Sequence, residues 1–221
     1  MYTDEPFSAY RRHPWHGLEP IPEGVEPGIV RAYIEMLPSD TVKYELDKST
    51  GFLVVDRPQR TTATPPALYG FIPRTYCAEE VAARCAHADV ADGDPLDICI
   101  FSERLITRAD ILLNARVVGG IQMIDEGEAD DKIIAVLEGD NIWGEVNDIK
   151  DLPPIKTERL QHYFSTYKMI PGKNVEIRVD GVYGREGNCR LAAGLSKPLR
   201  AFTANKRISP LLGIGSSLGH R

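Results

Sequence analysis

Short segments in which apolar and polar side chains largely alternate recur along most of the chain. The pattern is clear in residues 29–37 and 42–47, and the β-rich segment 52–57 follows after the turn DKSTG. Side chains of a strand point alternately to opposite faces, so this period predicts β-strands with one buried face. The turn predicts a hairpin between the second and third segments.

Five further segments have the same β-rich character, and they span residues 68–73, 97–101, 111–124, 132–138 and 173–184. The third is long and carries Gly119 and Gly120, a pair typical of a bent strand or a β-bulge. Many short strands joined mostly by hairpins favour a mainly β (α+β) fold. The expected architecture is a closed or nearly closed β-barrel with a flanking helix.

One segment, residues 153–168, has the apolar spacing of an α-helix. Asp151 is expected to be its N-cap, and the prolines at 153 and 154 suit a first turn. No run of 18 apolar residues and no apolar N-terminal leader is present, so the sequence predicts neither a membrane span nor secretion. We expect a cytoplasmic protein without a membrane partner.

Charge and composition divide the chain into three parts. Residues 1–28 are rich in proline, glycine and charge and are expected to form an irregular N-terminal arm, whereas 29–183 form a single domain. Residues 184–221 carry seven Lys/Arg and one acid, a net charge of +6, and are expected to be a basic, partly mobile extension. The first 183 residues hold 19 Lys/Arg and 31 Asp/Glu, a net charge of −12. This acidic body argues against nucleic acid as the main partner and is compatible with divalent cations.

The segment DGDPLD places Asp92, Asp94 and Asp97 directly before an apolar strand. A lone DGD is usually a turn, but two carboxylates about 4 Å apart repel by about 4 kcal/mol at an effective dielectric of about 20. The crowding therefore predicts a cation, a shared proton or a basic partner. A calcium-binding EF-hand is excluded, because Leu96 and Asp97 stand where that loop needs an oxygen ligand and a glycine.

A second acidic cluster, DEGEADD at 125–131, has five carboxylates and alone is most simply a solvated hairpin tip. Four basic residues accompany the acidic clusters. Lys43 and Arg57 stand at strand positions, Lys132 directly follows the second cluster, and Lys168 ends the predicted helix. Carboxylates hold hard cations such as Mg²⁺, and Lys and Arg hold phosphate oxygens. Together the two sets predict metal-assisted phosphoryl chemistry.

Several motifs in this order resemble the soluble family I inorganic pyrophosphatases. The motifs are AYIEM, VKYELDKSTGFLVVDR, LYGFIP, DGDPLDI, GGIQMIDEGEADDKIIAV and HYFSTYK, and they cover roughly residues 30–183. The resemblance implies a five-stranded, OB-like closed β-barrel with flanking α-helices, so that 29–183 would be a single catalytic domain. It implies hydrolysis of pyrophosphate to two orthophosphates with several Mg²⁺ ions per site, which Mn²⁺ or Zn²⁺ would replace. It also implies a homo-oligomer, a hexamer or smaller.

The resemblance further implies a role for each matching residue. The implied metal ligands are Asp92, Asp97, Asp125 and Asp130, and Glu35 and Glu45 form an acidic wall that reaches metal through water. Asp94 is the implied base beside the attacking water. The implied phosphate ligands are Lys43, Arg57, Tyr69, Lys132, Tyr167 and Lys168. The chain departs from the family at Pro65, where a tyrosine is common, and this removes one phenol from the site wall.

Two other functions compete with hydrolysis. An OB-like barrel can bind nucleic acid without catalysis, which needs a basic groove with exposed aromatic rings. A degenerate enzyme would instead sense polyphosphate or nucleotides. Phosphate release from pyrophosphate with Mg²⁺, and then with EDTA, distinguishes the enzyme from both.

Overall fold

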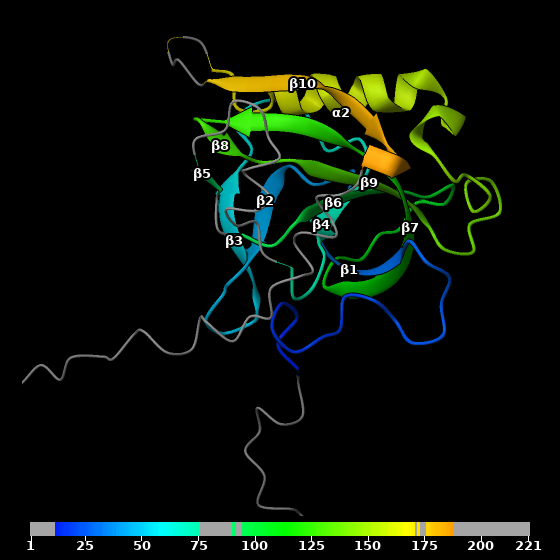
Figure 1. Ribbon diagram of the computed structural model, residues 1–221. Helices are drawn as coiled ribbons and strands as arrows, with labels where there is room; N and C mark the ends of the chain where they lie inside the picture. The colour runs from blue at the N-terminus through cyan, green and yellow to red at the C-terminus, as the bar shows by residue number, and fades with distance from the viewer. Residues whose placement is uncertain (1–11, 76–89, 92–93, 171, 173–175, 188–221) are drawn as a thin grey trace, which may run out of the picture.

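The computed structural model describes residues 12–75, 90–91, 94–170, 172 and 176–187. The strands are β1 (Ile29–Met36), β2 (Val42–Leu46), β3 (Leu53–Pro58), β4 (Leu68–Phe71), β5 (Val90–Ala91), β6 (Asp97–Phe101), β7 (Ile111–Asp125), β8 (Glu128–Ala129), β9 (Lys132–Leu137) and β10 (Ile177–Gly184). The helices are the 3₁₀ turns η2 (Ile149–Asp151) and η3 (Arg185–Gly187) and the α-helix α2 (Pro154–Thr166). Figure 1 shows their arrangement.

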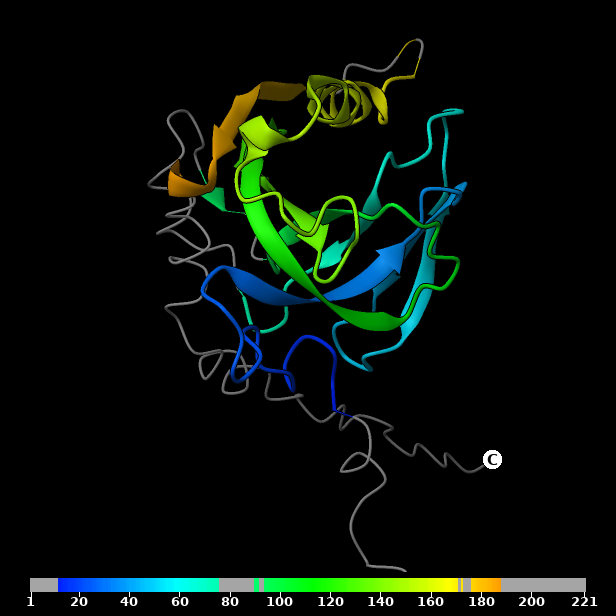
Figure 2. The same ribbon diagram turned by 90° about the vertical axis from the view of Figure 1, so that its right-hand side faces the viewer.

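Five strands close into a ring. Their order is β1-β4-β6-β9-β7, and a further pairing of β1 with β7 completes the circuit. All neighbours are antiparallel except β6 and β9, which are parallel. Figure 2 shows β1 and β7 crossing on the side of the ring that faces the viewer. The expected five-stranded closed, OB-like architecture is confirmed.

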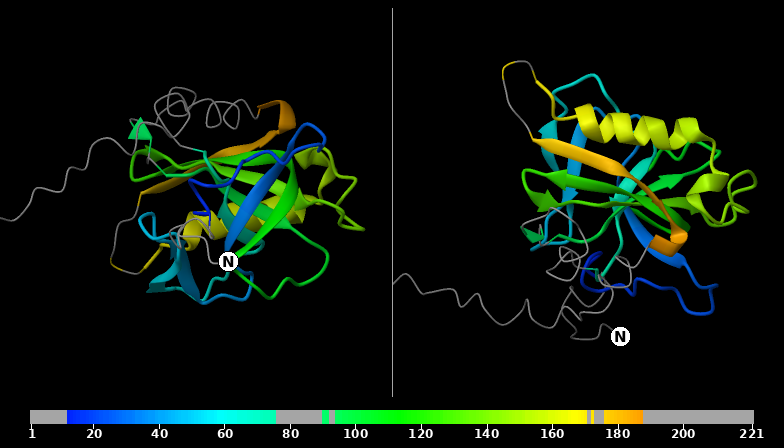
Figure 3. Two further views of the ribbon diagram at one scale, coloured as in Figure 1. Left: turned by 90° about the horizontal axis from the view of Figure 1, so that it is seen from below. Right: turned by 45° about the horizontal axis from the view of Figure 1, so that its top comes forward.

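The hairpin of β2 and β3 is a separate two-stranded sheet beside the ring. It is the hairpin predicted from the turn DKSTG, and it places Lys43 opposite Arg57. Figure 3 shows it projecting from the ring. Because it lies off the closed circuit, one of its faces is available to form the wall of a site.

Two apolar clusters explain why β9 is buried on both faces. One cluster lies within the ring and includes Ile98, Ile100 and Ile133. The other lies between the ring and α2, whose Leu160 and Phe164 pack against it. Figure 3 shows α2 lying alongside β10. The helical face predicted from the sequence is therefore the face that covers the ring.

The start of α2 differs from the prediction. The expected N-cap, Asp151, is the last residue of η2, where its Oδ2 accepts a hydrogen bond from the Asp148 amide at 3.1 Å. The N-cap of α2 is Pro153, which has no side-chain cap. Asp151 therefore closes the short turn before the helix, and the rigid pair of prolines sets the start of α2 itself.

The glycine pair in β7 lies at a predicted irregularity. The register between β7 and β9 shifts between Val117 and Gly119, which confirms the expected bulge or bend. A Cβ atom on Gly119 would lie 2.3 Å from the carbonyl oxygen of Tyr183, so only glycine allows β10 to approach here. The bend lets one long strand pair with both β1 and β10.

The N-terminal segment contacts the ring although residues 12–28 form no strand or helix. Trp15 is 1% exposed and packs in a cluster with Tyr33, Leu46 and Phe71. Within the residues described, no helix has the length and hydropathy required to cross a membrane.

Candidate active site

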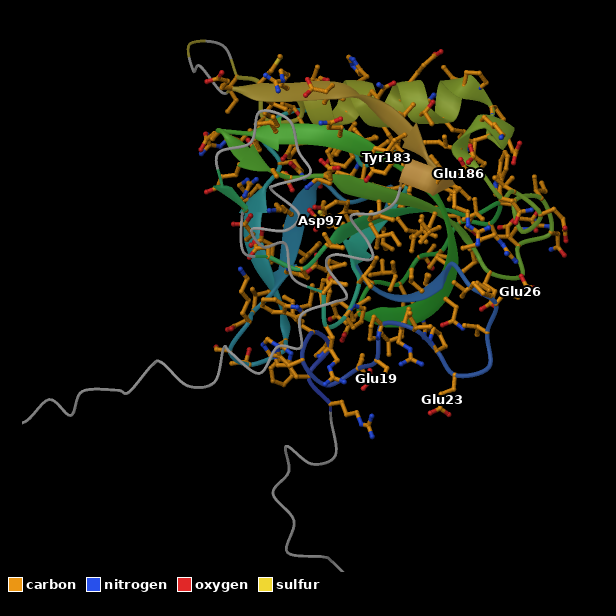
Figure 4. The ribbon with its side chains drawn as sticks, viewed as in Figure 1. Glu19, Glu23, Glu26, Asp97, Tyr183 and Glu186 are labelled. Carbon is orange, nitrogen blue, oxygen red and sulfur yellow. The ribbon has the colours of Figure 1, made fainter. Side chains whose placement is uncertain are left out.

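A cavity of about 430 Å³ lies where the β2–β3 hairpin, the turn between β7 and β8 and the end of α2 meet the ring. Among the described residues, its lining carries eight carboxylates and four lysines. The carboxylates are Glu35, Glu45, Asp94, Asp97, Asp125, Glu126, Glu128 and Asp130, and the lysines are Lys43, Lys48, Lys132 and Lys168. In Figure 4 Asp97 lies within the body of the molecule, whereas Glu19, Glu23 and Glu26 lie at its outer edge.

Lys132 stands at the centre of the charged lining. The parallel pairing of β6 with β9 places it opposite Asp97, and its Nζ lies 2.5 Å from Asp97 Oδ2. The same ammonium contacts the Asp130 carboxylate, two residues before it in the chain. Tyr69, from β4, donates a hydrogen bond to Asp97 Oδ2 at 2.6 Å. Carboxylates 33 positions apart in sequence therefore share one cation.

Burial and charge oppose each other in this group. Lys132 is 2% exposed, and burial disfavours its ammonium, but the Asp130 and Asp97 carboxylates outweigh burial and raise the pKa of Lys132 well above its usual value. Burial raises the pKa of Asp130 to about 6, although Lys132 favours the ionised form. At neutral pH the centre is therefore a charged group with limited access to water.

A second ion pair joins α2 to β7. Lys168 follows Tyr167, the C-cap of the helix, and its ammonium contacts the carboxylate of Asp125, the last residue of β7. The other oxygen of Asp125, Oδ1, is buried and has no hydrogen-bond partner among the residues that the structure describes. A buried carboxylate oxygen without a partner is costly, so this atom is suited to a cation.

Glu35 lies on β1 beneath the hairpin and is 7% exposed. The pKa of Glu35 is raised to about 8, chiefly by burial and also by the nearby Asp97 charge. The Leu46 amide, which donates a hydrogen bond to Glu35 Oε1 at 2.7 Å, acts in the opposite direction and lowers the pKa. Glu35 is therefore largely protonated at neutral pH as the site stands. A nearby divalent cation would favour its ionised form.

The hairpin contributes Lys43 and Glu45, which share the face of β2 toward the cavity and form an ion pair. Lys43 Nζ also lies 3.5 Å from Asp56 Oδ2. Arg57 does not line the cavity, and its guanidinium pairs with Asp56. Of the predicted phosphate ligands, Arg57 thus stands outside the lining but next to a residue in contact with Lys43.

Asp94 lines the cavity and pairs with Lys48, from the turn of the hairpin. Asp92, the first aspartate of the same segment, lies outside the described residues.

One wall of the cavity is aromatic. Tyr69, Tyr163, Phe164 and Tyr167 line it, and the rings of Tyr163 and Tyr167, one helical turn apart, are stacked at 5.3 Å. Burial raises the pKa of Tyr163 to about 12 and those of Tyr69 and Tyr167 well above the usual value. The phenols are therefore neutral hydrogen-bond donors at physiological pH.

The structure brings most of the sequence-predicted residues to one cavity. Those in the lining are Glu35, Lys43, Glu45, Tyr69, Asp94, Asp97, Asp125, Asp130, Lys132, Tyr167 and Lys168. Lining residues without a role assigned from sequence include Trp15, Lys48, Gln59, Glu126, Glu128 and Tyr163. Glu126 and Glu128 belong to the acidic cluster, so their position beside Asp125 could have identified them. Tyr163 lies four residues before Tyr167, so helical periodicity could have identified it. Trp15 and Lys48 carry no such signal.

The donor set fits a hard divalent cation, although within the described ranges no three His, Cys, Asp or Glu side chains are already grouped as ligands. The oxygens of Asp97, Asp125 and Asp130 contact lysine ammonium groups instead. Over the described part of the chain, carboxylates outnumber lysines in the lining by two to one, and Asp125 Oδ1 has no hydrogen-bond partner. Oxygen-rich, acidic sites of this kind suit Mg²⁺ and similar ions.

Comparisons with known proteins identify the family of the chain. A family model described as inorganic pyrophosphatase matches residues 32–192. An inorganic pyrophosphatase of Chlamydia muridarum is 47% identical over 184 residues, which cover 79% of this chain and 87% of that protein. A soluble inorganic pyrophosphatase of Oryza sativa is 38% identical over 165 residues, covering 75% and 70%. The crystal structure of the Thermus thermophilus inorganic pyrophosphatase matches with a TM-score of 0.69 and 29% identity, over 82% of this chain and 97% of that one. The chain therefore belongs to the soluble family I inorganic pyrophosphatases.

Proposed function

We propose that the protein hydrolyses inorganic pyrophosphate to two orthophosphates with Mg²⁺ as its physiological metal. The observation that carries the proposal is the convergence of Asp97 and Asp130 on Lys132, inside a cavity that holds both excess carboxylates and several lysines. A metal–diphosphate complex needs both ingredients, because the carboxylates hold the cations and the ammonium groups hold the phosphate oxygens.

Asp97, Asp125 and Asp130 would hold the metal directly, with Asp92 completing the set that the sequence predicts. Glu35 and Glu45 would form the acidic wall behind them. Bound Mg²⁺ ions neutralise phosphate charge and lower the pKa of a coordinated water. Several such ions would share the site, and Mn²⁺ or Zn²⁺ would replace them, since both accept carboxylate ligands.

The remaining residues would bind the diphosphate and accept the proton of the attacking water. Asp94 takes or orients the proton of the attacking water. Lys43, Lys132 and Lys168 stabilise the charge that develops on the phosphate oxygens, together with Arg57 from the hairpin. Tyr69 and Tyr167 donate hydrogen bonds without adding another charge to be desolvated.

Non-catalytic binding of nucleic acid or polyphosphate is not supported. Such a protein needs a basic groove with exposed aromatic platforms. Here eight carboxylates line the cavity, and its tyrosines stand beside acids. The same carboxylates would repel a polyanion that arrives without its own cations.

Phosphate release from pyrophosphate by the wild type and by Asp94→Asn tests the proposal. Asp94→Asn should lower turnover by about a hundredfold or more without lowering the melting temperature, because a positioned base contributes about 10²–10⁴. Asp180→Asn is the matched control, since Asp180 pairs with Arg178 on β10. A wild type that releases no phosphate would reject the function, and near-full turnover in Asp94→Asn would reject the role of Asp94.

We also propose that the protein is a cytoplasmic homo-oligomer, a hexamer or smaller. The similarity to the pyrophosphatase family supports this proposal. Sedimentation at several protein concentrations tests it, and a monomer at every concentration would reject it.

A further inference from the structure

The N-terminal segment 13–17 (HPWHG) contributes one residue, Trp15, to the lining of the cavity. The Trp15 indole Nε1–H donates to the Thr75 carbonyl at 2.9 Å in a buried hydrogen bond. The His16 ring stacks on Trp15 at 4.6 Å, and His13 stacks on His16 at 4.4 Å. This segment precedes residues 32–192, which the family model matches.

The hairpin turn 47–51 rests on the same segment. A Cβ atom on Gly51 would lie 2.8 Å from Cδ2 of the His13 ring, and Gly51 has φ +73°. Asp47 Oδ1 accepts hydrogen bonds from the amide of Ser49 at 2.7 Å and from its hydroxyl at 2.6 Å. The backbone on both sides of Lys48 is therefore held by the turn and by the His13 ring beneath it.

Lys48 contacts both Trp15 of this N-terminal segment and Asp94, the proposed base. Its Nζ lies 5.8 Å from the centre of the Trp15 ring, within the range of a cation–π interaction. The same ammonium contacts the Asp94 carboxylate. The Lys48 side chain is 53% exposed, and exposed ion pairs contribute little to folding stability. The contact therefore has little value for the fold, although it lies within the site.

We propose that Lys48 is a positioning residue for Asp94 and that buried Trp15 is the platform that orients Lys48. This inference rests on the proposed function and gives the segment 13–17 a role in it. Lys48 and Trp15 act through Asp94 and do not react with the substrate. Three distant stretches of the chain would thus fix one carboxylate at the cavity wall.

Steady-state kinetics on three variants test the positioning role. Lys48→Met keeps much of the side chain but removes its charge, and it should lower kcat by about ten- to a hundredfold with KM changed less than threefold, because misplacing a reacting group costs up to about 10² in rate. Lys48→Arg keeps the charge and should restore kcat to within about threefold of wild type. Lys150→Met is the matched control, since Lys150 is exposed and outside the cavity lining, and it should leave kcat unchanged.

A double-mutant cycle connects the effect to Asp94. In an Asp94→Asn background, Lys48→Met should cause less than a further twofold loss, because residues that act as a unit are not additive. Trp15→Phe should lower kcat less than Lys48→Met does, again with KM changed less than threefold. Melting temperatures of the Lys48 variants should match that of the wild type.

Fluorescence supplies a readout that does not depend on turnover. The chain has two tryptophans, so in a Trp143→Phe background Trp15 is the sole reporter. Lys48→Met should shift the Trp15 emission maximum, because a charge near an indole ring alters its emission, whereas Lys150→Met should not.

Several results would overturn the inference. One is an unchanged kcat in Lys48→Met, and another is an increase in KM alone, which would make Lys48 a substrate ligand. The others are a kcat loss in the Asp94→Asn background as large as in the wild-type background, and a Trp15 emission maximum that Lys48→Met does not shift. A wild type without pyrophosphatase activity would reject the proposed function instead, and the emission measurement would still decide whether Lys48 and Trp15 are in contact.

Discussion

Lys132 is the residue on which the charge balance of the site depends most. It is a buried ammonium held by two carboxylates, and removing one partner of such a group leaves uncompensated buried charge. The sequence predicts that Lys132 and Asp97 both belong to the site, through the resemblance of their motifs. It could not predict that one ammonium bridges Asp97 and Asp130, because that contact depends on the parallel register of β6 and β9.

Lys132→Met should destabilise the metal-free protein. In EDTA at pH 8 its free energy of unfolding should fall by about 3–5 kcal/mol, since Asp97 and Asp130 lose their shared cation. Saturating Mg²⁺ should narrow the gap to wild type, because in the variant the cation meets Asp97 and Asp130 without competition from the Lys132 ammonium and so stabilises the folded state more than it does in the wild type. Thermal unfolding measures both effects, with Lys150→Met as control. Equal stability of Lys132→Met and wild type in EDTA would contradict the buried ion-pair description.

Glu35 should make the metal-free protein less stable as the pH rises. Burial raises its folded-state pKa to about 8 from the usual 4.5, so between these values the unfolded chain releases a proton that the folded chain retains. Stability should therefore fall by on the order of 4 kcal/mol across this window relative to Glu35→Gln, which cannot ionise. Denaturant unfolding at a series of pH values in EDTA measures the difference. Parallel pH profiles for the two proteins would show that Glu35 titrates normally.

At the scale of elements, the turn between β7 and β8 determines where two metal-ligand candidates lie. Glu126 has φ +51° and Gly127 has φ +89°, so both central residues adopt the left-handed conformation of a tight hairpin turn. Asp125 ends the strand before the turn, and Asp130 follows the strand after it. Taken alone, the acidic cluster 125–131 predicts a solvated hairpin tip, and a hairpin is present there, since β7 continues through Asp125 and pairs with β8.

Gly127→Ala should therefore affect the site as well as the fold. A side chain at this φ is strained, which costs about 1 kcal/mol of stability, and relief of the strain would move Asp125 and Asp130. Gly139→Ala is a matched control, because Gly139 has φ +74° with open space around it and lies outside the cavity lining. Both variants should lose similar stability, but only Gly127→Ala should lose turnover or Mg²⁺ affinity, as measured by kinetics and calorimetry. Equal turnover and Mg²⁺ affinity in the two variants would show that the turn does not determine the positions of Asp125 and Asp130.

Elements were predictable where the local pattern agrees with tertiary packing. Alternation identifies the β2–β3 hairpin, and helical spacing identifies the face of α2 that covers the ring. The prediction of Asp151 as N-cap was wrong because two overlapping local signals compete there, and Asp151 pairs with Asp148 in the preceding turn. Trp15 was not predicted as a cavity residue, because its contacts are with residues far along the chain, including Thr75.

At the scale of the molecule, the ring provides a rigid frame and the segments around it provide the charges. Closure of β1 on β7 leaves no free edge between them, so the carboxylates of β1, β6 and β7 have fixed relative positions. The net charge predicts an acidic body but not where its acids lie, whereas the three-dimensional structure places eight carboxylates of the described residues around one cavity. Ring closure depends on pairing between distant strands, which local patterns do not specify.

Truncation after Gly187 should leave fold and hydrolysis unchanged. The Arg185 guanidinium donates to the Pro27 carbonyl at 2.7 Å, and its amide donates to Asp148 Oδ2 at 3.1 Å, so this end of β10 is tied to the body before position 188. Truncation after Gly172 is the contrasting control, because it removes β10 from β7. Melting temperature and kcat should match those of the full chain only for the longer of the two truncated proteins. A large loss of either after truncation at 187 would show that the basic extension belongs to the domain.

Anomalous diffraction from crystals grown with Mn²⁺ tests the central claim most directly. We predict anomalous peaks within direct coordination distance of the Asp97 and Asp130 carboxylates, with the Lys132 ammonium displaced from at least one of them. Crystals of active protein whose Mn²⁺ peaks lie outside this cavity, with Lys132 still bridging Asp97 and Asp130, would contradict the account.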